Sequence, residues 1–241
     1  MTNPWQRHVK IGDCDLYLGK SQDVIPALGK VNALITDPPY GINGSNGTIG
    51  KKRNKGAYTG VFPDTPEYIR DVIVPIIEAS LSISDRGAVT TGGKNCGFYP
   101  NPTAVGGYVQ SASSGLCVWG SCTLQPIFFY VRDPRIGKTI TPITYYLNEA
   151  PAKVGHPCPK PQKAWTWLVN KSATFGQTVL DPFLGSGTTL ISCASLGLKG
   201  IGIEMDPDYF EIACKRVQAA YDQPDLFVAP PTKPTQDGFD L

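Results

Sequence analysis

Two short segments hold the residues whose types and spacing could do chemistry. The first, Asp37-Pro38-Pro39-Tyr40, directly follows the apolar run of residues 31–36. Its carboxylate is a hydrogen-bond acceptor, its prolines fix the backbone, and its tyrosine offers a planar face. The second, residues 181–189, reads Asp-Pro-Phe-Leu-Gly-Ser-Gly-Thr-Thr and directly follows the expected strand of residues 178–180. Each segment predicts a turn at the end of a strand.

The first segment suits an aromatic amine. The lone pair of such an amine is delocalised into its ring, which makes the nitrogen a poor nucleophile. If the Asp37 carboxylate accepted one N–H and a backbone carbonyl such as that of Pro38 the other, the nitrogen would become pyramidal and direct its lone pair at an electrophile. A base extruded from a duplex also needs a stacking partner, which Tyr40 could supply. The catalytic residues predicted here are Asp37, Pro38, Pro39 and Tyr40.

The second segment suits a nucleoside. A Gly-rich turn between a strand and a helix binds ligands at the carboxyl edge of a parallel sheet. The turn lacks the lysine of a P-loop and the third glycine of the dinucleotide fingerprint, whereas Glu204, 19 residues after Gly185, could accept two ribose hydroxyls. The alternative is that the glycines only allow close packing. The predicted binding residues are Asp181, Pro182, Phe183, Gly185, Ser186, Gly187, Thr188, Thr189 and Glu204.

Together these motifs resemble a known family. Residues 37–40 and 181–187 resemble the catalytic and cofactor motifs of S-adenosylmethionine-dependent amino-methyltransferases that act on DNA. The order, with the catalytic motif first, resembles the permuted β class. Residues 156–161 (His-Pro-Cys-Pro-Lys-Pro) resemble the His-Pro-Thr-Gln-Lys-Pro element of that class. The layout is most similar to small adenine methyltransferases carried by phages and to those of restriction–modification systems.

The resemblance implies a Rossmann-like class I methyltransferase fold, which is α/β with a mainly parallel twisted sheet and helices on both faces. S-adenosylmethionine would lie over residues 181–189 with Glu204 on its ribose, and a flipped adenine of DNA would lie at residues 37–40. The permutation also implies that residues 9–18 supply the strand expected after the helix of residues 206–221. The family includes dimers, so a homodimer is an open alternative to a monomer.

Two positions depart from the family pattern. The family has Gly-Asp before the first helix, near the cofactor adenine, whereas Lys20 follows Gly19 here. Lys20 is therefore predicted at this position beside the cofactor. Because Cys158 and its proline replace Thr-Gln, only Lys160 and Pro161 carry over from that element as cofactor-side residues.

The net charge of +2 hides an uneven distribution. The tail of residues 222–241 holds four acids and one base, which leaves +5 on residues 1–221, and residues 41–58 and 86–163 are both basic. Basic segments beside the catalytic turn could contact DNA phosphates, although a solvated loop without a role is the ordinary alternative. The predicted DNA contacts are Lys51, Lys52, Arg53, Lys55, Arg132, Arg135 and Lys138.

The composition excludes several classes. No apolar run reaches the roughly 18 residues of a membrane span, and residues 1–20 show no signal-peptide core, so a cytoplasmic protein is expected. The seven cysteines are scattered without a CxxC pair, which indicates reduced thiols. The spacings of Cys117, Cys122, His156 and Cys158 fit no zinc template, so no metal is expected.

Hydrophobic periodicity predicts alternating strands and helices, which favours an α/β fold. One domain is expected over residues 1–221, with a target-recognition insertion at about residues 92–155 and a disordered tail over 222–241. Residues 92–115 and 133–157 are expected to be irregular. Strands are expected at 87–91, 116–122, 126–132, 178–180 and 200–204, a hairpin or strand at 9–18, and helices at 23–28, 66–83 with an interruption at Pro75, 164–170, 188–196 and 206–221.

Three alternatives to adenine-N6 methylation remain open. Cytosine-N4 methylation uses the same fold, and its enzymes more often begin the catalytic turn with serine, so Asp37 favours adenine without excluding cytosine. Lys20 motivates a degenerate DNA-binding protein with weak or no catalysis. A glutamine-modifying enzyme of this fold would be expected to have asparagine at position 37.

Overall fold

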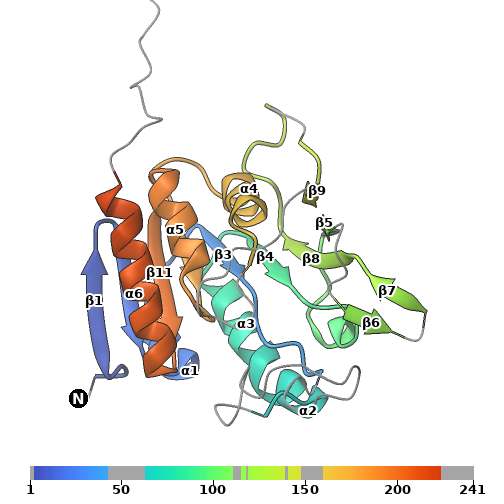
Figure 1. The fold of residues 1–241 in the computed structure, drawn as a ribbon, viewed down its shortest axis with the longest axis horizontal. Helices are drawn as coiled ribbons and strands as arrows, with labels where there is room; N and C mark the ends of the chain where they lie inside the picture. Colours follow the sequence, from blue (N-terminus) through green and yellow to red (C-terminus); the bar gives the residue numbers. More distant parts are fainter. Residues whose placement is uncertain are drawn as a thin grey trace, which may run out of the picture.

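A nine-stranded mixed sheet forms the centre of the molecule (Figure 1). The computed structural model describes residues 3–42, 63–110, 115–117, 119–138, 141–147 and 160–223. The strand order is β1-β2-β11-β10-β3-β4-β8-β5-β9, and β6 pairs with β7 in a separate hairpin. The strands are β1 (Arg7–Ile11), β2 (Cys14–Leu18), β3 (Ala33–Thr36), β4 (Gly87–Thr90), β5 (Ala104–Gln110), β6 (Gly115–Cys117), β7 (Gly120–Cys122), β8 (Leu124–Tyr130), β9 (Thr144–Leu147), β10 (Thr178–Asp181) and β11 (Lys199–Glu204).

The parallel part of the sheet is formed by β2, β11, β10, β3 and β4, so the carboxyl ends of these strands meet at one edge. The outer strands β1 and β8 run antiparallel to their neighbours. This arrangement confirms the expected α/β fold with a mainly parallel sheet. Two of these strands, β3 (Ala-Leu-Ile-Thr) and β4 (Gly-Ala-Val-Thr), are buried along their whole length because helices cover both faces of the sheet.

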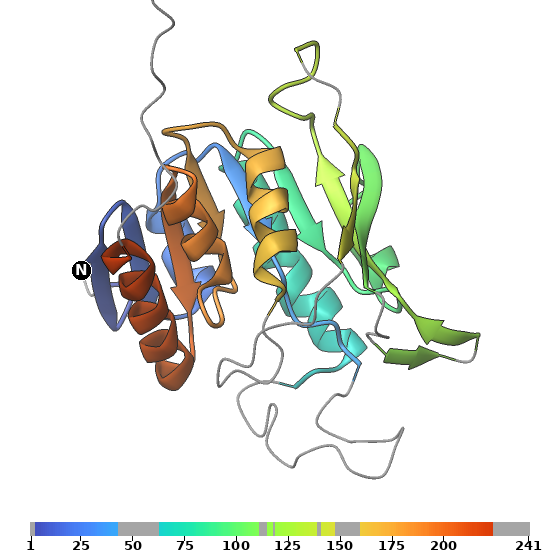
Figure 2. The same cartoon turned by 45° about the horizontal axis from the view of Figure 1, so that its top comes forward.

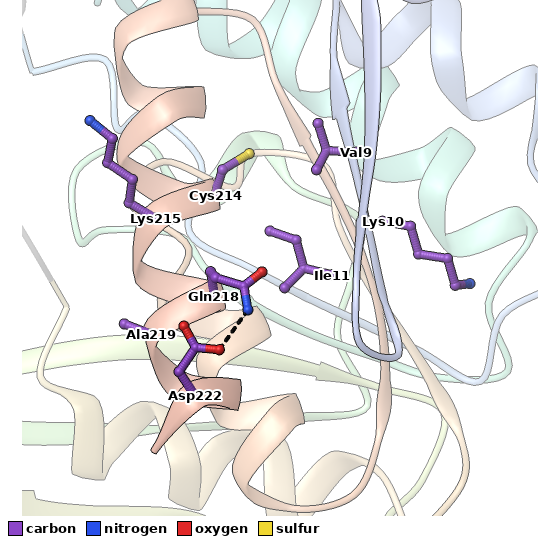
Figure 3. A pocket seen from close by; sticks show the side chains of 8 residues that line it. All are labelled: Val9, Lys10, Ile11, Cys214, Lys215, Gln218, Ala219 and Asp222. Atoms are coloured by element: carbon purple, nitrogen blue, oxygen red, sulfur yellow. Dashed lines mark hydrogen bonds between the residues drawn. The ribbon is translucent and has the colours of Figure 1, made fainter. Parts of the chain in front are cut away.

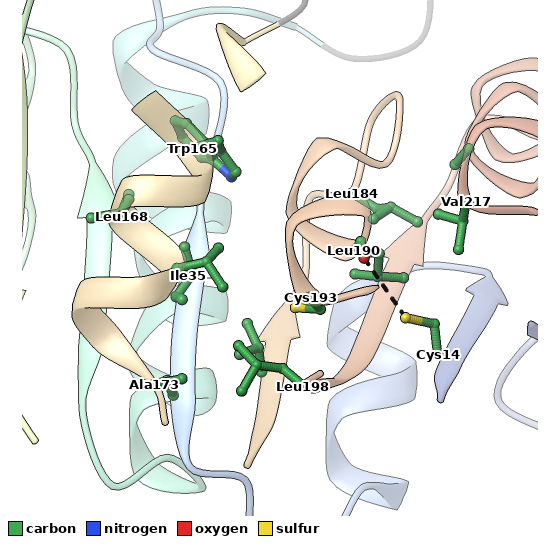
Figure 4. Close-up of a cluster of buried hydrophobic side chains, with 14 of the residues drawn as sticks. Cys14, Ile35, Trp165, Leu168, Ala173, Leu184, Leu190, Cys193, Leu198 and Val217 are labelled. Atoms are coloured by element: carbon green, nitrogen blue, oxygen red, sulfur yellow. Dashed lines mark hydrogen bonds between the residues drawn. The ribbon is translucent and has the colours of Figure 1, made fainter. Parts of the chain in front are cut away.

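Helices pack on both faces of the sheet (Figure 2). One apolar cluster joins the sheet to α4 (Gln162–Ser172), α5 (Thr188–Ser195) and α6 (Pro207–Asp222). It contains Phe210 together with Trp165 and Leu190, which Figure 4 shows. A second cluster joins the opposite face to α1 and α3 through Val24 and Ile77. Of the helices in the described ranges, none is long and apolar enough to cross a membrane. The helical segments are α1 (Ser21–Val24), η1 (Ile25–Ala27), α2 (Pro66–Tyr68), η2 (Ile69–Ile73), α3 (Val74–Ser82), η3 (Cys96–Phe98), α4 (Gln162–Ser172), α5 (Thr188–Ser195) and α6 (Pro207–Asp222).

The start of the chain completes the sheet next to its last strand. β2 lies parallel to β11, with Leu18 paired to Glu204, and β1 closes the edge as the second half of a hairpin. The backbone N–H of Asp13 donates to the Tyr221 hydroxyl at 3.0 Å, which ties this hairpin to the end of α6. The expectation that residues 9–18 adjoin the helix of residues 206–221 is therefore confirmed.

The outer half of the sheet differs from the sequence expectation. The two segments expected to be irregular contain β5 and β9, and the single strand expected over residues 116–122 is instead the β6–β7 hairpin. The reason is visible in β5: a Cβ at Gly106 would lie 2.0 Å from the Ile143 carbonyl oxygen, and one at Gly107 would lie 2.5 Å from that of Gln125. These glycines permit the close strand pairing. They also interrupt the alternation of apolar and polar side chains by which a strand is recognised in a sequence.

The helix expected over residues 66–83 is interrupted as Pro75 suggested. A π-helical turn, η2, precedes α3, and Pro75 lies in the first turn of α3. A proline ring clashes with the carbonyl four residues earlier in a regular helix, and a wider turn relieves that clash.

Candidate active site

Both predicted segments lie at the carboxyl edge of the parallel strands. Asp37 follows β3, Asp181 ends β10 and Glu204 ends β11, while Thr90 ends β4. β3 and β10 are neighbours in the sheet, so the catalytic turn and the Gly-rich turn adjoin. This edge is where α/β proteins with parallel strands bind ligands.

The Asp37 carboxylate accepts three side-chain donors. Its Oδ1 accepts from the hydroxyls of Tyr40 and Thr90, and its Oδ2 lies 2.6 Å from Lys160 Nζ. The Tyr40 hydroxyl in turn accepts from Gln125 Nε2 at 2.7 Å and lies 3.4 Å from Lys160 Nζ. The turn is thus held by residues from β4, β8 and the segment before α4.

The backbone of the turn is held as firmly as its side chains. Asn95 Nδ2 donates to the carbonyl oxygens of Tyr40 at 2.6 Å and Gly41 at 3.1 Å, and the Gly41 N–H donates to Asp64 at 2.6 Å. Gly41 has φ +66°, and a Cβ there would lie 2.6 Å from Ile69. Glycine is therefore needed immediately after Tyr40.

Tyr40 acts as a neutral phenol. Burial and the Asp37 carboxylate raise the pKa of Tyr40 well above its ordinary value. The hydroxyl therefore keeps its proton and donates it to Asp37 in a hydrogen bond. Its contribution is to orient the carboxylate and to present its ring at the site.

Asp181 stabilises the Gly-rich turn through hydrogen bonds in the core. Only 2 % exposed, it accepts from the hydroxyls of Thr36 (at 2.6 Å) and Thr189 and from the Phe183 N–H at 3.1 Å. Trp165 Nε1 donates to the Thr189 hydroxyl at 2.8 Å. Burial raises the pKa of Asp181 to about 6, although its donors oppose that shift. Both carboxylate oxygens are buried and already accept hydrogen bonds from protein groups, so Asp181 is placed to support the turn rather than to contact a ligand directly.

Glu204 is oriented by the backbone on both sides. Its Oε2 accepts the Gly185 N–H and its Oε1 the Asp206 N–H, each at 2.8 Å. Burial raises the pKa of Glu204 to about 7. Each carboxylate oxygen has a lone pair left for a further donor, such as a ribose hydroxyl. Gly187, at the other end of the turn, has φ +83° and is the N-cap residue of α5.

The remaining predicted cofactor residues surround this turn with one exception. Pro182 accepts from the Ser21 hydroxyl, Ser186 Oγ accepts from Arg216 at 2.7 Å, and Thr188 begins α5. Lys20 is exposed and follows Gly19, whose N–H donates to the Glu204 carbonyl at 2.9 Å. Pro161 caps α4. The exception is Lys160, which contacts the catalytic turn instead.

The structure does not bring Arg132, Arg135 and Lys138 to this edge. They follow β8, whose last residue pairs with the first residue of β4, so they lie at the amino end of the parallel strands. Arg135 donates to the Asn170 and Ala173 carbonyls, at the end of α4. Cations suit helix C-termini, and DNA contact by these three residues stays a prediction. Lys51, Lys52, Arg53, Lys55, His156 and Cys158 lie outside the described residues.

Sequence reasoning missed several residues of the site. Thr90, Asn95 and Gln125 contact the catalytic turn from distant segments, and no motif marks them. Trp119, at the tip of the β6–β7 hairpin, is 95 % exposed. The hairpin leads directly into β8, which carries Gln125.

A shallow groove elsewhere on the molecule is not part of this site. It lies between the edge strand β1 and the end of α6 (Figure 3). There Gln218 Nε2 donates to Asp222 at 2.8 Å. α6 follows β11 and returns along the sheet, so its end lies away from the carboxyl edge that holds Asp37.

Comparison with known proteins relates the chain to DNA methylases. Residues 115–215 match a family described as DNA methylase, the N6_N4_Mtase family. Type II methyltransferase M.HpaI of Haemophilus parainfluenzae is 38 % identical over 66 residues, which cover 27 % of this chain and 21 % of that protein. Type II methyltransferase M2.DpnII of Streptococcus pneumoniae is 41 % identical over 64 residues, 27 % of this chain and 24 % of that protein. These matches span about a fifth to a quarter of each relative's length.

Solved structures are similar over most of the chain. The M1.HpyAVI–SAM complex has a TM-score of 0.64 at 17 % identity, over 85 % of this chain and 98 % of the other. The cytosine-N4-specific PvuII DNA methyltransferase also has a TM-score of 0.64, at 12 % identity, over 90 % and 95 % of the two chains. The chain therefore has the class I methyltransferase fold, and its residues 115–215 match the DNA methylase family.

Proposed function

We propose that the protein transfers a methyl group from S-adenosylmethionine to the exocyclic N6 amine of an adenine flipped out of DNA. The observation that carries this proposal is the adjacency of two turns at one sheet edge. Asp37, an acceptor for an amine, follows the residue that is hydrogen-bonded to Asp181 of the Gly-rich turn. A reacting amine and a nucleoside cofactor could therefore be held side by side.

The residues of the Gly-rich turn fit S-adenosylmethionine. Glu204 offers acceptors for ribose hydroxyls, and the turn has no lysine that would hold a phosphate. The M1.HpyAVI structure, which is similar in fold, was solved as a complex with SAM. When bound, this cofactor supplies a methyl group on a positively charged sulfur, and the carbon–sulfur bond breaks as the amine nitrogen bonds to carbon.

The catalytic turn would orient and activate the amine. Asp37 accepts one N–H of the amine, and the Pro38 carbonyl accepts the other, so the nitrogen lone pair is directed away from the purine ring. After transfer the nitrogen is a very acidic ammonium, so its proton leaves readily to Asp37 or water. Tyr40 holds the carboxylate by its hydroxyl and offers its ring to the flipped base.

DNA would approach across the same edge. Trp119 on the β6–β7 hairpin and Lys94, which is exposed and adjacent to Asn95, are the described residues best suited to contact it. A two-stranded ribbon fits a groove of the duplex, and a cation there would contact phosphates. Lys51, Lys52, Arg53 and Lys55 are proposed from sequence as further phosphate contacts.

Cytosine-N4 methylation is the second candidate. The PvuII enzyme, named as cytosine-N4-specific, has the same fold, and both substrates present an exocyclic aromatic amine. The aspartate at position 37 favours adenine. A weakly catalytic DNA-binding protein is the third candidate, because Lys20 stands where the family has an acid.

One assay separates these candidates. Unmethylated plasmid is incubated with the protein and S-adenosylmethionine, digested to nucleosides, and analysed by mass spectrometry for N6-methyladenine and N4-methylcytosine. N6-methyladenine supports the proposal, whereas N4-methylcytosine alone selects the second candidate. The absence of both modified nucleosides overturns the proposed activity.

A pair of aspartate variants gives the control. Asp37→Ala is expected to abolish transfer while leaving the Kd for S-adenosylmethionine, measured by calorimetry, within about twofold of wild type. Asp23→Ala, on the exposed side of α1, is expected to retain transfer. If the Asp37→Ala protein were as active as wild type, residues 37–40 would not be the catalytic turn.

A further inference from the structure

Lys160 holds an unexpected position in the structure. The sequence places it with the cofactor residues, yet its ammonium lies 2.6 Å from Asp37 Oδ2. It lies 3.4 Å from the Tyr40 hydroxyl and 5.2 Å from the centre of the Tyr40 ring, which puts it beside the hydroxyl end of that ring. Its side chain is 14 % exposed and that of Asp37 is 21 % exposed, so the ion pair is partly shielded from water.

The two oxygens of Asp37 are used differently. Oδ1 accepts from the hydroxyls of Thr90 and Tyr40, and a carboxylate oxygen has room for about two such donors. Oδ2 accepts from Lys160. An incoming amine that donates to Asp37 must therefore use Oδ2, the oxygen that the ammonium already contacts.

We infer that Lys160 takes the place of the substrate amine on Asp37 in the ligand-free protein and withdraws when the base enters. This inference rests on the proposed function. Both groups are nitrogen donors to one carboxylate oxygen, so they compete for it. Lys160 is accordingly a positioning residue, which keeps the acceptor oriented while no base is bound.

Of the three side chains that donate to Asp37, that of Lys160 can move away most readily. Thr90 is fully buried in β4, and Tyr40 is held by Gln125 and Asp37 together. The lysine has a flexible four-carbon side chain. Its backbone is anchored because Pro161 is the N-cap residue of α4 and Gln162 Nε2 donates to Ser192 of α5 at 2.8 Å.

The charge of the cofactor would favour this withdrawal. For methyl transfer, the amine nitrogen must approach the methyl carbon to roughly 3–3.5 Å, so the positive sulfur lies within several ångströms of the same place. An ammonium at Asp37 would then be repelled by that sulfur. S-adenosylhomocysteine, which has no methyl group and no charge on sulfur, would not repel it. The base should therefore enter more readily with S-adenosylmethionine than with S-adenosylhomocysteine.

Base entry can be followed with 2-aminopurine placed next to the target adenine of a duplex, whose recognition site is mapped by sequencing methylated plasmid. The probe brightens when the adenine leaves the stack, and the N6 amine that competes with Lys160 is kept. Wild type is expected to bind this duplex, and raise its fluorescence, at several-fold lower protein concentration with S-adenosylmethionine than with S-adenosylhomocysteine. Lys160→Met should bind and flip the base equally well with either cofactor, and more tightly than wild type with S-adenosylhomocysteine. Lys160→Arg, which keeps the charge, should restore the difference.

The controls separate a failed inference from a failed function. Lys163→Met, one turn along at the exposed start of α4, should behave as wild type. If wild type raises no fluorescence with either cofactor, the proposed function fails. If wild type flips the base but Lys160→Met keeps the cofactor difference or flips more weakly, the inference is overturned. Lys160→Gln provides the same comparison if Lys160→Met has a lowered Tm.

Discussion

The hydroxyl of Thr36 donates to Asp181 Oδ1 at 2.6 Å, between the ends of two neighbouring strands. Thr36 is fully buried and Asp181 is 2 % exposed. The first residue directly precedes the catalytic turn, and the second begins the Gly-rich turn. This buried hydrogen bond therefore links the two turns directly, in addition to the pairing of β3 with β10.

Replacing Thr36 by valine tests this connection. The side chain keeps its shape but leaves Asp181 without one donor, and a lost bond to a buried carboxyl costs about 1–3 kcal/mol of unfolding free energy. Urea denaturation should show a lower midpoint, and kcat should fall because Asp37 follows directly. Thr123→Val, at an exposed position, should leave the midpoint unchanged. A Thr36→Val protein as stable as wild type would mean that the bond contributes nothing.

The stability of the ligand-free protein should fall as pH rises from about 4.5 to about 7. Burial raises the pKa of Glu204 from 4.5 to about 7, so the folded state keeps a proton there that the unfolded state has lost. Stability then decreases with pH across that window, by up to about 3 kcal/mol from this group. Asp181, whose pKa is raised to about 6, adds an effect of the same sign. Denaturation at several pH values measures the slope, which Glu204→Gln should reduce.

Cofactor affinity should change in the opposite direction. A ribose hydroxyl donates more strongly to an ionised Glu204 than to a protonated one, so the Kd for S-adenosylmethionine should fall as pH rises through about 7. Calorimetry at pH 6 and pH 8 measures the change. Glu204→Gln should bind more weakly at pH 8 and lose the pH dependence. If the Kd of the Glu204→Gln protein depended on pH as steeply as that of wild type, another group would be responsible for the pH dependence.

The sequence predicted the residues of the site that belong to continuous motifs. Asp37 follows β3, and Asp181 and Glu204 end β10 and β11, and parallel strand order in an α/β fold brings such positions together. Thr90 and Gln125 belong to no motif: Thr90 reaches Asp37 through the parallel pairing of β3 with β4, and Gln125 reaches the Tyr40 hydroxyl from β8, which pairs antiparallel with β4.

The same limit applies to the cations that follow β8. Arg135 looks like a surface cation in the sequence, but the direction of β8 brings it to the end of α4. Charge alone does not reveal strand direction, so it could not predict at which end of the sheet this residue lies.

Gly92→Ala should disturb the catalytic turn without affecting the cofactor site. Gly92 has φ +62°, and a Cβ there would lie 2.9 Å from the Tyr40 ring. The ring would have to move and loosen its bond to Asp37, so kcat should fall about tenfold or more while the Kd for S-adenosylmethionine stays constant. Gly93→Ala is the matched control, because a Cβ at that position meets no atom within 4 Å. Equal kcat values for the two variants would contradict this account of the turn.

Trp119 is expected to contact DNA. The indole is 95 % exposed on the β6–β7 hairpin, which projects beyond the sheet (Figure 2) and joins β8 close to Gln125. Stacking of an aromatic side chain on a base contributes about 1–3 kcal/mol, so Trp119→Ala should raise the KM for DNA roughly tenfold. Because the side chain is exposed, Tm should not change.

Phe175 provides the control for Trp119. It is 87 % exposed but precedes β10, so it lies at the opposite, amino end of the parallel strands. Phe175→Ala should therefore leave the KM for DNA unchanged. DNA should quench tryptophan fluorescence in wild type and in Phe175→Ala. This quenching should be lost in Trp119→Ala. If the two variants changed KM equally, exposed apolar area rather than the position of the hairpin would explain the effect.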